Sequence, residues 1–261
     1  MSTEQARDEL VHHMVERGVA TLTLDSPHNR NALSDRLVRQ LLEALVRADE
    51  DEHVRAIVLT HTGNTFCAGV DLTEAAQNSG SEAATARSEQ LVELLRMILT
   101  LGTPVVASID GHVRAGGMGI IGACDVVVSG PRSTFALTEA RIGVAPSIIS
   151  LVVLSRLGDR AASRLCLTGE AFGASEAARI GFVTEAAQDR DAALGRLLTD
   201  FRAVSPQGLR ETKLLVNHGI LATFDAGRDR VIEQSTRLFM SEEAAEGMRA
   251  FLEKRPPRWA R

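Results

Sequence analysis

Two short, strongly apolar segments, each followed by a glycine-rich loop, constrain the fold of this 261-residue chain most tightly. Residues 56–59 read AIVL and residues 105–109 read VVASI. Strands without a polar face are typical of a parallel sheet that is covered on both faces. The alternating run VATLTL at 19–24 predicts a further strand, and so do residues 125–128. Helical segments separate these strands, so we expect an α/β fold with a parallel core.

Helices are predicted on both sides of this core. Asn31 or Ser34 can cap a helix whose apolar residues, from Leu37 to Leu45, share one face. After Ser147 the chain becomes mainly helical, and its apolar faces are too many to cover one sheet, which favours packing against each other or another subunit. These helices are expected at residues 148–156, 161–167, 175–180, 192–203, 206–216, 226–239 and 242–254.

The composition excludes several classes of protein. A net charge of -5 argues against partners such as nucleic acid or an anionic membrane. The chain has no tyrosine, and Lys213 and Lys254 are its only lysines. Cys67, Cys124 and Cys166 lie far apart and the histidines do not cluster, so we expect reduced thiols and no metal. A polar, acidic start and the lack of a long apolar segment predict a cytoplasmic protein.

Two glycine-rich segments carry the candidate chemistry. Residues 64–72 (NTFCAGVDL) follow one apolar strand, and residues 111–119 (GHVRAGGMG) follow the other. Ligands of open α/β sheets bind in the loops beyond the carboxyl ends of the strands. The second segment is expected to open a helix, where Gly116 and Gly117 would offer unpaired amides at the positive end of the helix dipole. Such amides suit a developing oxyanion.

A nicotinamide-binding alternative comes from a literal GxGxxG at residues 117–122, with Glu139 downstream. The dinucleotide fingerprint places its first glycine directly at the end of a strand. Here Gly117 lies well past Ile109, and the glycines are expected inside a helix. A purely structural alternative, in which the glycines allow close packing of a helix and a strand, also remains open.

Six motifs follow one another along the chain. They are PHNRNAL at 27–33, FCAGVDL at 66–72, residues 111–117 with Cys124 and Asp125, FALTEARIGVAP at 135–146, LTG at 167–169 with residues 174–181, and EGMRAFLEKR at 246–255. With these motifs the sequence resembles the enoyl-CoA hydratase/isomerase (crotonase) family over nearly its whole length. The resemblance implies a repeated ββα catalytic core in residues 1–200, a C-terminal helical trimerisation region in residues 201–261, and acyl-CoA thioester substrates. Coenzyme A would be part of the substrate, no separate cofactor is expected, and the assembly would be a homotrimer or a dimer of trimers.

The same resemblance assigns roles to individual residues. It implies that the backbone amides of Val70 and Gly116 form the oxyanion hole and that Glu139 exchanges a proton with the α carbon of the substrate. Phe251 and Lys254 match tail positions that reach the CoA of a neighbouring subunit in family members. The predicted substrate and CoA contacts are His28, Arg30, Asn31, Ala32, Ala68, Gly69, Asp71, Leu72, Gly117, Pro146, Phe251 and Lys254.

One position departs from the hydratase pattern. The second glutamate of the family's hydratases, which positions the attacking water, would stand at Gly119. The pattern around it looks most like methylglutaconyl-CoA hydratase-type members, so we expect hydration of a 2-enoyl-CoA with Glu139 as the one acid and base. The alternatives are a double-bond isomerase that uses Glu139 and a CoA-binding member without catalysis. Leu91, Leu94 and Met97 are candidate walls of the acyl pocket.

Overall fold

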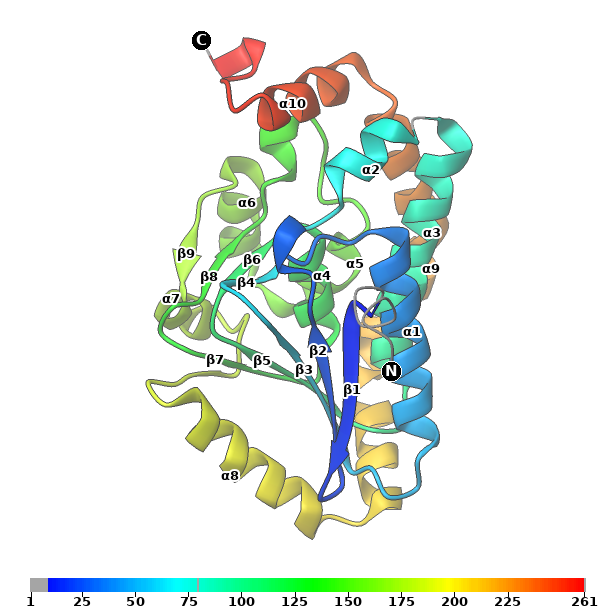
Figure 1. Ribbon diagram of the computed structural model, residues 1–261, viewed down its shortest axis with the longest axis vertical. Helices are drawn as coiled ribbons and strands as arrows, with labels where there is room; N and C mark the ends of the chain where they lie inside the picture. Colours follow the sequence, from blue (N-terminus) through cyan, green and yellow to red (C-terminus); the bar gives the residue numbers. More distant parts are fainter. Residues whose placement is uncertain (1–8, 79, 261) are drawn as a thin grey trace.

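The computed structural model describes residues 9–78 and 80–260, and two sheets form its centre (Figure 1). The larger sheet has the strand order β1-β2-β3-β5-β7-β10. β1 runs antiparallel to β2, and the other neighbouring pairs are parallel. Its strands span Val11–Glu16 (β1), Val19–Leu24 (β2), Ala56–His61 (β3), Val105–Ile109 (β5), Val126–Ser129 (β7) and Glu185–Ala186 (β10).

The smaller sheet lies beyond the carboxyl ends of these strands and has the order β4-β6-β8-β9. β4, β6 and β8 are parallel to one another, and β9 is antiparallel to β8. These strands are very short, so side chains that follow them stay close to the end of the sheet. They span Thr65–Cys67 (β4), His112–Arg114 (β6), Thr134–Ala136 (β8) and Phe172–Gly173 (β9).

A strand of the larger sheet, a strand of the smaller sheet and a helix alternate along the chain. β3 and β4 lead to α2 (Leu72–Gln77) and α3 (Ser81–Thr100), and β5 and β6 lead to α4 (Gly116–Ala123). β7 and β8 lead to the 3₁₀ helix η3 (Glu139–Ile142) and α5 (Ser150–Arg156). The repeated ββα architecture that the sequence resemblance implies is therefore present, and the glycines of the GxGxxG run lie inside α4.

Helices cover both faces of the larger sheet, which explains its apolar strands. α1 (Asp35–Glu50) packs on β1, β2 and β3, and the Ser34 side chain accepts a hydrogen bond from the Leu37 amide at its start. α8 (Arg190–Ala203) lies on the opposite face, as Figure 1 shows, over a cluster of three buried valines from β2, β3 and β5. Ser34 rather than Asn31 is thus the helix cap.

The C-terminal region differs from the prediction in one respect. Residues 206–216 and 226–239 were expected to be two helices, but α9 is continuous from Pro206 to Phe239. The intervening residues include Ile220 and Phe224, which are buried in the main core, and the helix packs along α3 and α5. This tertiary burial outweighs the low helix propensity of Gly219 and Gly227. The remaining helices are η2 (Pro27–Asn29), α6 (Asp159–Thr168), α7 (Ala174–Arg179), α10 (Glu242–Leu252) and η4 (Arg258–Ala260).

A buried ion pair fastens α9 to the larger sheet. The Lys213 ammonium lies 2.8 Å from the Asp125 carboxylate and donates to the carbonyl oxygens of Ile98 and Thr103. Asp125 also accepts hydrogen bonds from the Val105 amide and from the Asn217 side chain. Both charges are therefore compensated inside the protein. Within residues 9–78 and 80–260, every helix is too short or too polar to cross a bilayer.

Candidate active site

The three ββα repeats bring Val70, Gly116 and Glu139 to one edge of the smaller sheet. Val70 follows β4, Gly116 follows β6 and Glu139 follows β8. Because these strands are parallel and adjacent, with β6 in the middle, their carboxyl ends face the same way. All three residues line one cavity. The predicted catalytic group is therefore assembled from equivalent points of three repeats.

The Val70 and Gly116 amides have no acceptor within the described part of the chain. Val70 sits in a parallel bridge with Leu33, in which the Leu33 amide donates to the Gly69 oxygen and the Asp71 amide donates to the Leu33 oxygen. The Val70 N–H lies between these two bonds and points away from them, since strand residues alternate. Gly116 is the first residue of α4, where an amide has no partner within the helix. Two donors are thus left for a ligand oxygen.

Backbone conformations that side chains disfavour hold these two amides close together. Gly69 has a φ of +91°, and a Cβ atom built there would lie 2.7 Å from the Ala115 Cβ and 3.4 Å from the Gly116 nitrogen. Ala115 itself has a φ of 46° and a ψ of −119°, which is strained for a residue with a side chain. This strain turns the chain sharply from β6 into α4 and aims the Gly116 amide at the cavity.

Glu139 is a buried acid, and one of its two carboxyl oxygens has no partner among the described residues. It is the first residue of η3, its exposed fraction is 8%, and its Oε2 atom has no hydrogen-bond partner among the described residues. Burial disfavours the charged carboxylate and raises its pKa from 4.5 to about 7. The alternative role, a helix-start glutamate beside a capping Thr138, is not supported, because the Thr138 side chain makes no capping hydrogen bond. An acid with a pKa near neutrality can accept and return a proton.

The cavity beside these groups has a volume of about 620 Å³. Its walls come from the loops after β2, β4, β6 and β8, from one face of α3, and from the ends of α9 and α10. The space is large enough for the thioester end of an extended ligand. Two backbone donors, one buried acid with a raised pKa and an apolar wall are the parts that acyl-transfer and enolate chemistry require.

Comparison with known proteins agrees with this geometry. The enoyl-CoA hydratase/isomerase family matches the chain over residues 14–261. The chain belongs to this family. The crystal structure of an enoyl-CoA hydratase from Mycobacterium avium is 53% identical, covers 97% of this chain and 99% of that one, and superposes with a TM-score of 0.90. The mitochondrial methylglutaconyl-CoA hydratase of Homo sapiens is 31% identical over 99% of this chain and 79% of its own length.

Most of the predicted contacts of this family member lie in the cavity wall. Those in the wall are His28, Arg30, Ala32, Ala68, Asp71, Leu72, Pro146 and Phe251. Asn31, Gly69 and Gly117 lie behind it. The Asn31 side chain bonds the Thr65 oxygen and the Ser26 amide, and Gly117 packs so closely on Cys67 that a Cβ would lie 2.8 Å away. These three residues therefore support the residues of the cavity wall from behind.

One of the three residues predicted for the acyl pocket lines the cavity. Leu91 lines the cavity, whereas Leu94 is fully buried and Met97 packs against the main core. One face of α3 lines the cavity with Ala84, Arg87, Ser88 and Leu91. These positions have the i, i+3, i+4, i+7 spacing of a helix face. Leu94 and Met97 lie further along α3, where the helix packs in the main core, so the prediction extended the cavity-lining face too far.

The C-terminal helix α10 closes one end of the cavity in its own chain. Phe251 and Leu252 line the cavity, while Lys254 lies outside the wall. Phe251 therefore contacts the cavity of its own chain, and its predicted contact with the CoA of a neighbouring subunit stays a prediction. α10 packs directly on η3, where a Cβ on Gly247 would lie 2.3 Å from the Ile142 oxygen. The position of Glu139 thus depends on α10.

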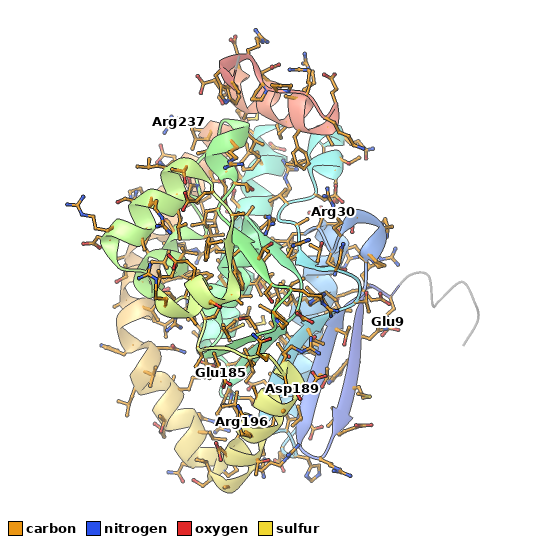
Figure 2. All side chains as sticks on the ribbon, turned by 90° about the vertical axis from the view of Figure 1, so that its left-hand side faces the viewer. Glu9, Arg30, Glu185, Asp189, Arg196 and Arg237 are labelled. Atoms are coloured by element: carbon orange, nitrogen blue, oxygen red, sulfur yellow. The ribbon has the colours of Figure 1, made fainter. Side chains whose placement is uncertain are left out.

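Sequence reasoning missed several charged residues of the wall. Four arginines line the cavity against two carboxylates, although the whole chain carries a net charge of -5. The additional arginines are Arg87, Arg114 and Arg141. Arg114 and Arg141 stand inside the six family motifs but received no predicted role, and Arg87 lies outside those motifs. Figure 2 shows Arg30 in the half of the molecule that carries α10, with Glu185, Asp189 and Arg196 in the opposite half. The local excess of positive charge suits an anionic ligand despite the acidic whole.

Proposed function

We propose that this chain is an enoyl-CoA hydratase that adds water to a 2-enoyl-CoA thioester, with Glu139 as the one acid and base. The observation that carries the proposal is the buried Glu139 carboxyl, which has an unpartnered Oε2 atom and a pKa of about 7 and lines the same cavity as two unpaired amides. A carboxyl so poised changes its protonation state easily at neutral pH. Membership of the enoyl-CoA hydratase/isomerase family supports the choice of an acyl-CoA substrate.

In the proposed reaction the thioester oxygen accepts hydrogen bonds from the Val70 and Gly116 amides. The Glu139 carboxylate takes a proton from water, and the water oxygen forms a bond to the β carbon. The π electrons move to the thioester oxygen and give an enolate, which the two amides stabilise. Protonated Glu139 then donates its proton to the α carbon. The product is a 3-hydroxyacyl-CoA, and the Glu139 carboxylate is regenerated.

The arginine-rich wall supports the proposal that coenzyme A enters as part of the substrate. We propose that no other cofactor takes part. Arg30 and His28, in the loop after β2, stand at the mouth of the cavity and would contact its phosphates. Lys254, outside the wall of its own chain, could reach the CoA of a neighbour only in an assembled homotrimer or dimer of trimers, which we propose as the working state in the cytoplasm. A sedimentation experiment tests that assembly directly.

The test of the hydratase is Glu139→Gln, assayed with a panel of 2-enoyl-CoA and 3-enoyl-CoA thioesters and with product identification. The methylglutaconyl-CoA hydratase relative makes a branched, carboxylated 2-enoyl thioester the first member of the panel. We expect wild type to form a 3-hydroxyacyl-CoA and Glu139→Gln to lose about 10²–10⁴-fold in kcat, the range for general acid–base catalysis. CoA binding should be unchanged. Full activity of the variant would refute the role of Glu139.

A double-bond isomerase is the second candidate, and Gly119 is the observation that favours it. An isomerase needs only one base, which removes a proton from one carbon and returns it to another on the same face. The same thioester panel separates the two functions. Conversion of a 3-enoyl-CoA to a 2-enoyl-CoA without a hydroxylated product would assign the isomerase, and binding without any product would assign a member that has lost catalysis.

A further inference from the structure

The position of the family's second glutamate cannot supply a carboxylate in this chain. Gly119 lies inside α4, and a Cβ built on it would be 2.5 Å from the Ile149 Cγ2 atom and 3.1 Å from the Ile149 Cβ. The Leu95 Cδ1 atom would lie 3.3 Å away on another side. Two aliphatic side chains therefore fill the space that a longer residue would need. A hydratase built on this frame must position its water with another group.

Ser147 has the properties that such a group needs. Its exposed fraction is 5%, it lines the cavity together with Glu139, and its Oγ atom has no hydrogen-bond partner among the described residues. The backbone of Ser147 is fixed on both sides, because its amide donates to the Ala145 oxygen at 2.7 Å and its oxygen accepts from the Ser150 hydroxyl at 2.6 Å. The hydroxyl alone is left unused.

The loop that carries Ser147 is attached to Glu139. The loop begins at Gly143, directly after η3. The Val144 amide donates a hydrogen bond to the backbone carbonyl oxygen of Glu139 at 3.2 Å. Glu139 and Ser147 thus both line the cavity from one short stretch of chain, and each has one buried, unpartnered side-chain oxygen, Oε2 and Oγ respectively. Buried polar groups are nearly always satisfied by protein or by an ordered water, and such a water needs two or more polar partners.

We propose that the Ser147 hydroxyl is the second acceptor for the water that adds to the substrate, in place of the missing glutamate. This inference rests on the proposed hydration. One hydrogen of the water points to Glu139, which removes it as the oxygen bonds to the β carbon. The other hydrogen points to Ser147 Oγ and stays on the oxygen, becoming the hydroxyl hydrogen of the product. With both hydrogens held, a lone pair of the water faces the β carbon.

The experiment compares Ser147→Ala with Ser108→Ala as a matched control. Ser108 is also a buried serine whose Oγ has no described partner, but it lies on β5 and away from the cavity wall. Two reactions are measured for each protein. Hydration of a 2-enoyl-CoA needs a positioned water, whereas exchange of the α proton of the saturated acyl-CoA in D₂O needs only Glu139 and the two amides.

We expect Ser147→Ala to lower kcat for hydration by about tenfold, the value of one hydrogen bond, with KM and α-proton exchange close to wild type. Ser108→Ala should change neither reaction, and Glu139→Gln should abolish both. Equal losses of hydration and exchange in Ser147→Ala would show a structural role and overturn the inference, as would unchanged hydration. Wild type that exchanges the α proton but hydrates no thioester would refute the hydratase itself, and the inference with it.

Discussion

Two acids in the interior of this protein, Asp125 (side chain 15% exposed) and Glu139 (8% exposed), have opposite environments. Asp125 receives the Lys213 ammonium, the Val105 amide and the Asn217 side chain, so each of its oxygens is satisfied. Glu139 has an oxygen without a described partner and a pKa raised to about 7. Asp125 lies directly before β7, and Glu139 follows β8. The first fastens α9 to the sheet, and the second faces the cavity.

The difference shows what each acid is for. Removing the partner of a compensated buried charge costs much stability, and the compensated carboxylate has no free lone pair for a ligand. Such a group suits a structural role. An uncompensated carboxyl destabilises the fold but changes protonation near neutral pH, which suits proton transfer. Destabilised groups of this kind mark functional sites. Three measurements can break or sharpen the contrast.

The largest effect is expected for Lys213→Met, which leaves Asp125 buried without its cation. We expect the free energy of unfolding to fall by about 3–5 kcal/mol in urea titrations, as for other buried pairs that lose one partner. The double variant with Asp125→Asn removes the orphaned charge and should recover part of the loss. A Lys213→Met protein as stable as wild type would show that Asp125 is no better compensated than Glu139.

The next effect is the cost of burying Glu139. Because its folded pKa is about 7 and its ordinary value is 4.5, the folded state holds a proton that the unfolded state loses between these two values. The stability of wild type should therefore fall as pH rises from 4.5 to 7, by about 3 kcal/mol in all, and stay level above.

Glu139→Gln serves as the reference for this pH dependence, because its side chain does not ionise. In urea titrations at several pH values, the free energy of unfolding of the variant should rise relative to that of wild type between pH 4.5 and 7. If the difference between the two proteins does not change with pH, then Glu139 is not the desolvated acid that the structure describes.

The smallest effect is expected at the surface, with Arg96→Ala. Arg96 pairs with Asp225 across α3 and α9 at 2.9 Å, but the two side chains are 44% and 49% exposed. Solvent screening limits such pairs to about 1 kcal/mol or less, and salt should reduce the effect further. A loss as large as that of Lys213→Met would mean that proximity, rather than burial, decides the strength of the ion pairs between α9 and the core.

Local patterns predicted many of the elements. The alternation of residues 19–24 and the apolar runs at 56–59 and 105–109 correspond to β2, β3 and β5, because side-chain periodicity reflects which faces are covered. The prediction failed where long-range contacts decide. α9 continues through Gly219 and Gly227 because the chain around them is packed on α3 and α5. Lys213, which had no predicted role, forms an ion pair with Asp125, a residue far away in the sequence.

The site divides in the same way. Motifs along the chain identified Val70, Gly116 and Glu139, since each stands in a short pattern of its own, and they showed that Gly119 lacks a carboxylate. Only the tertiary structure showed that Ile149 and Leu95 occupy the space beside Gly119, that four arginines meet in an acidic protein, and that Ser147 and Glu139 share a wall. The physical reason is that residue identity and local spacing are properties of a segment, whereas burial, charge compensation and a pKa depend on neighbours from elsewhere in the chain.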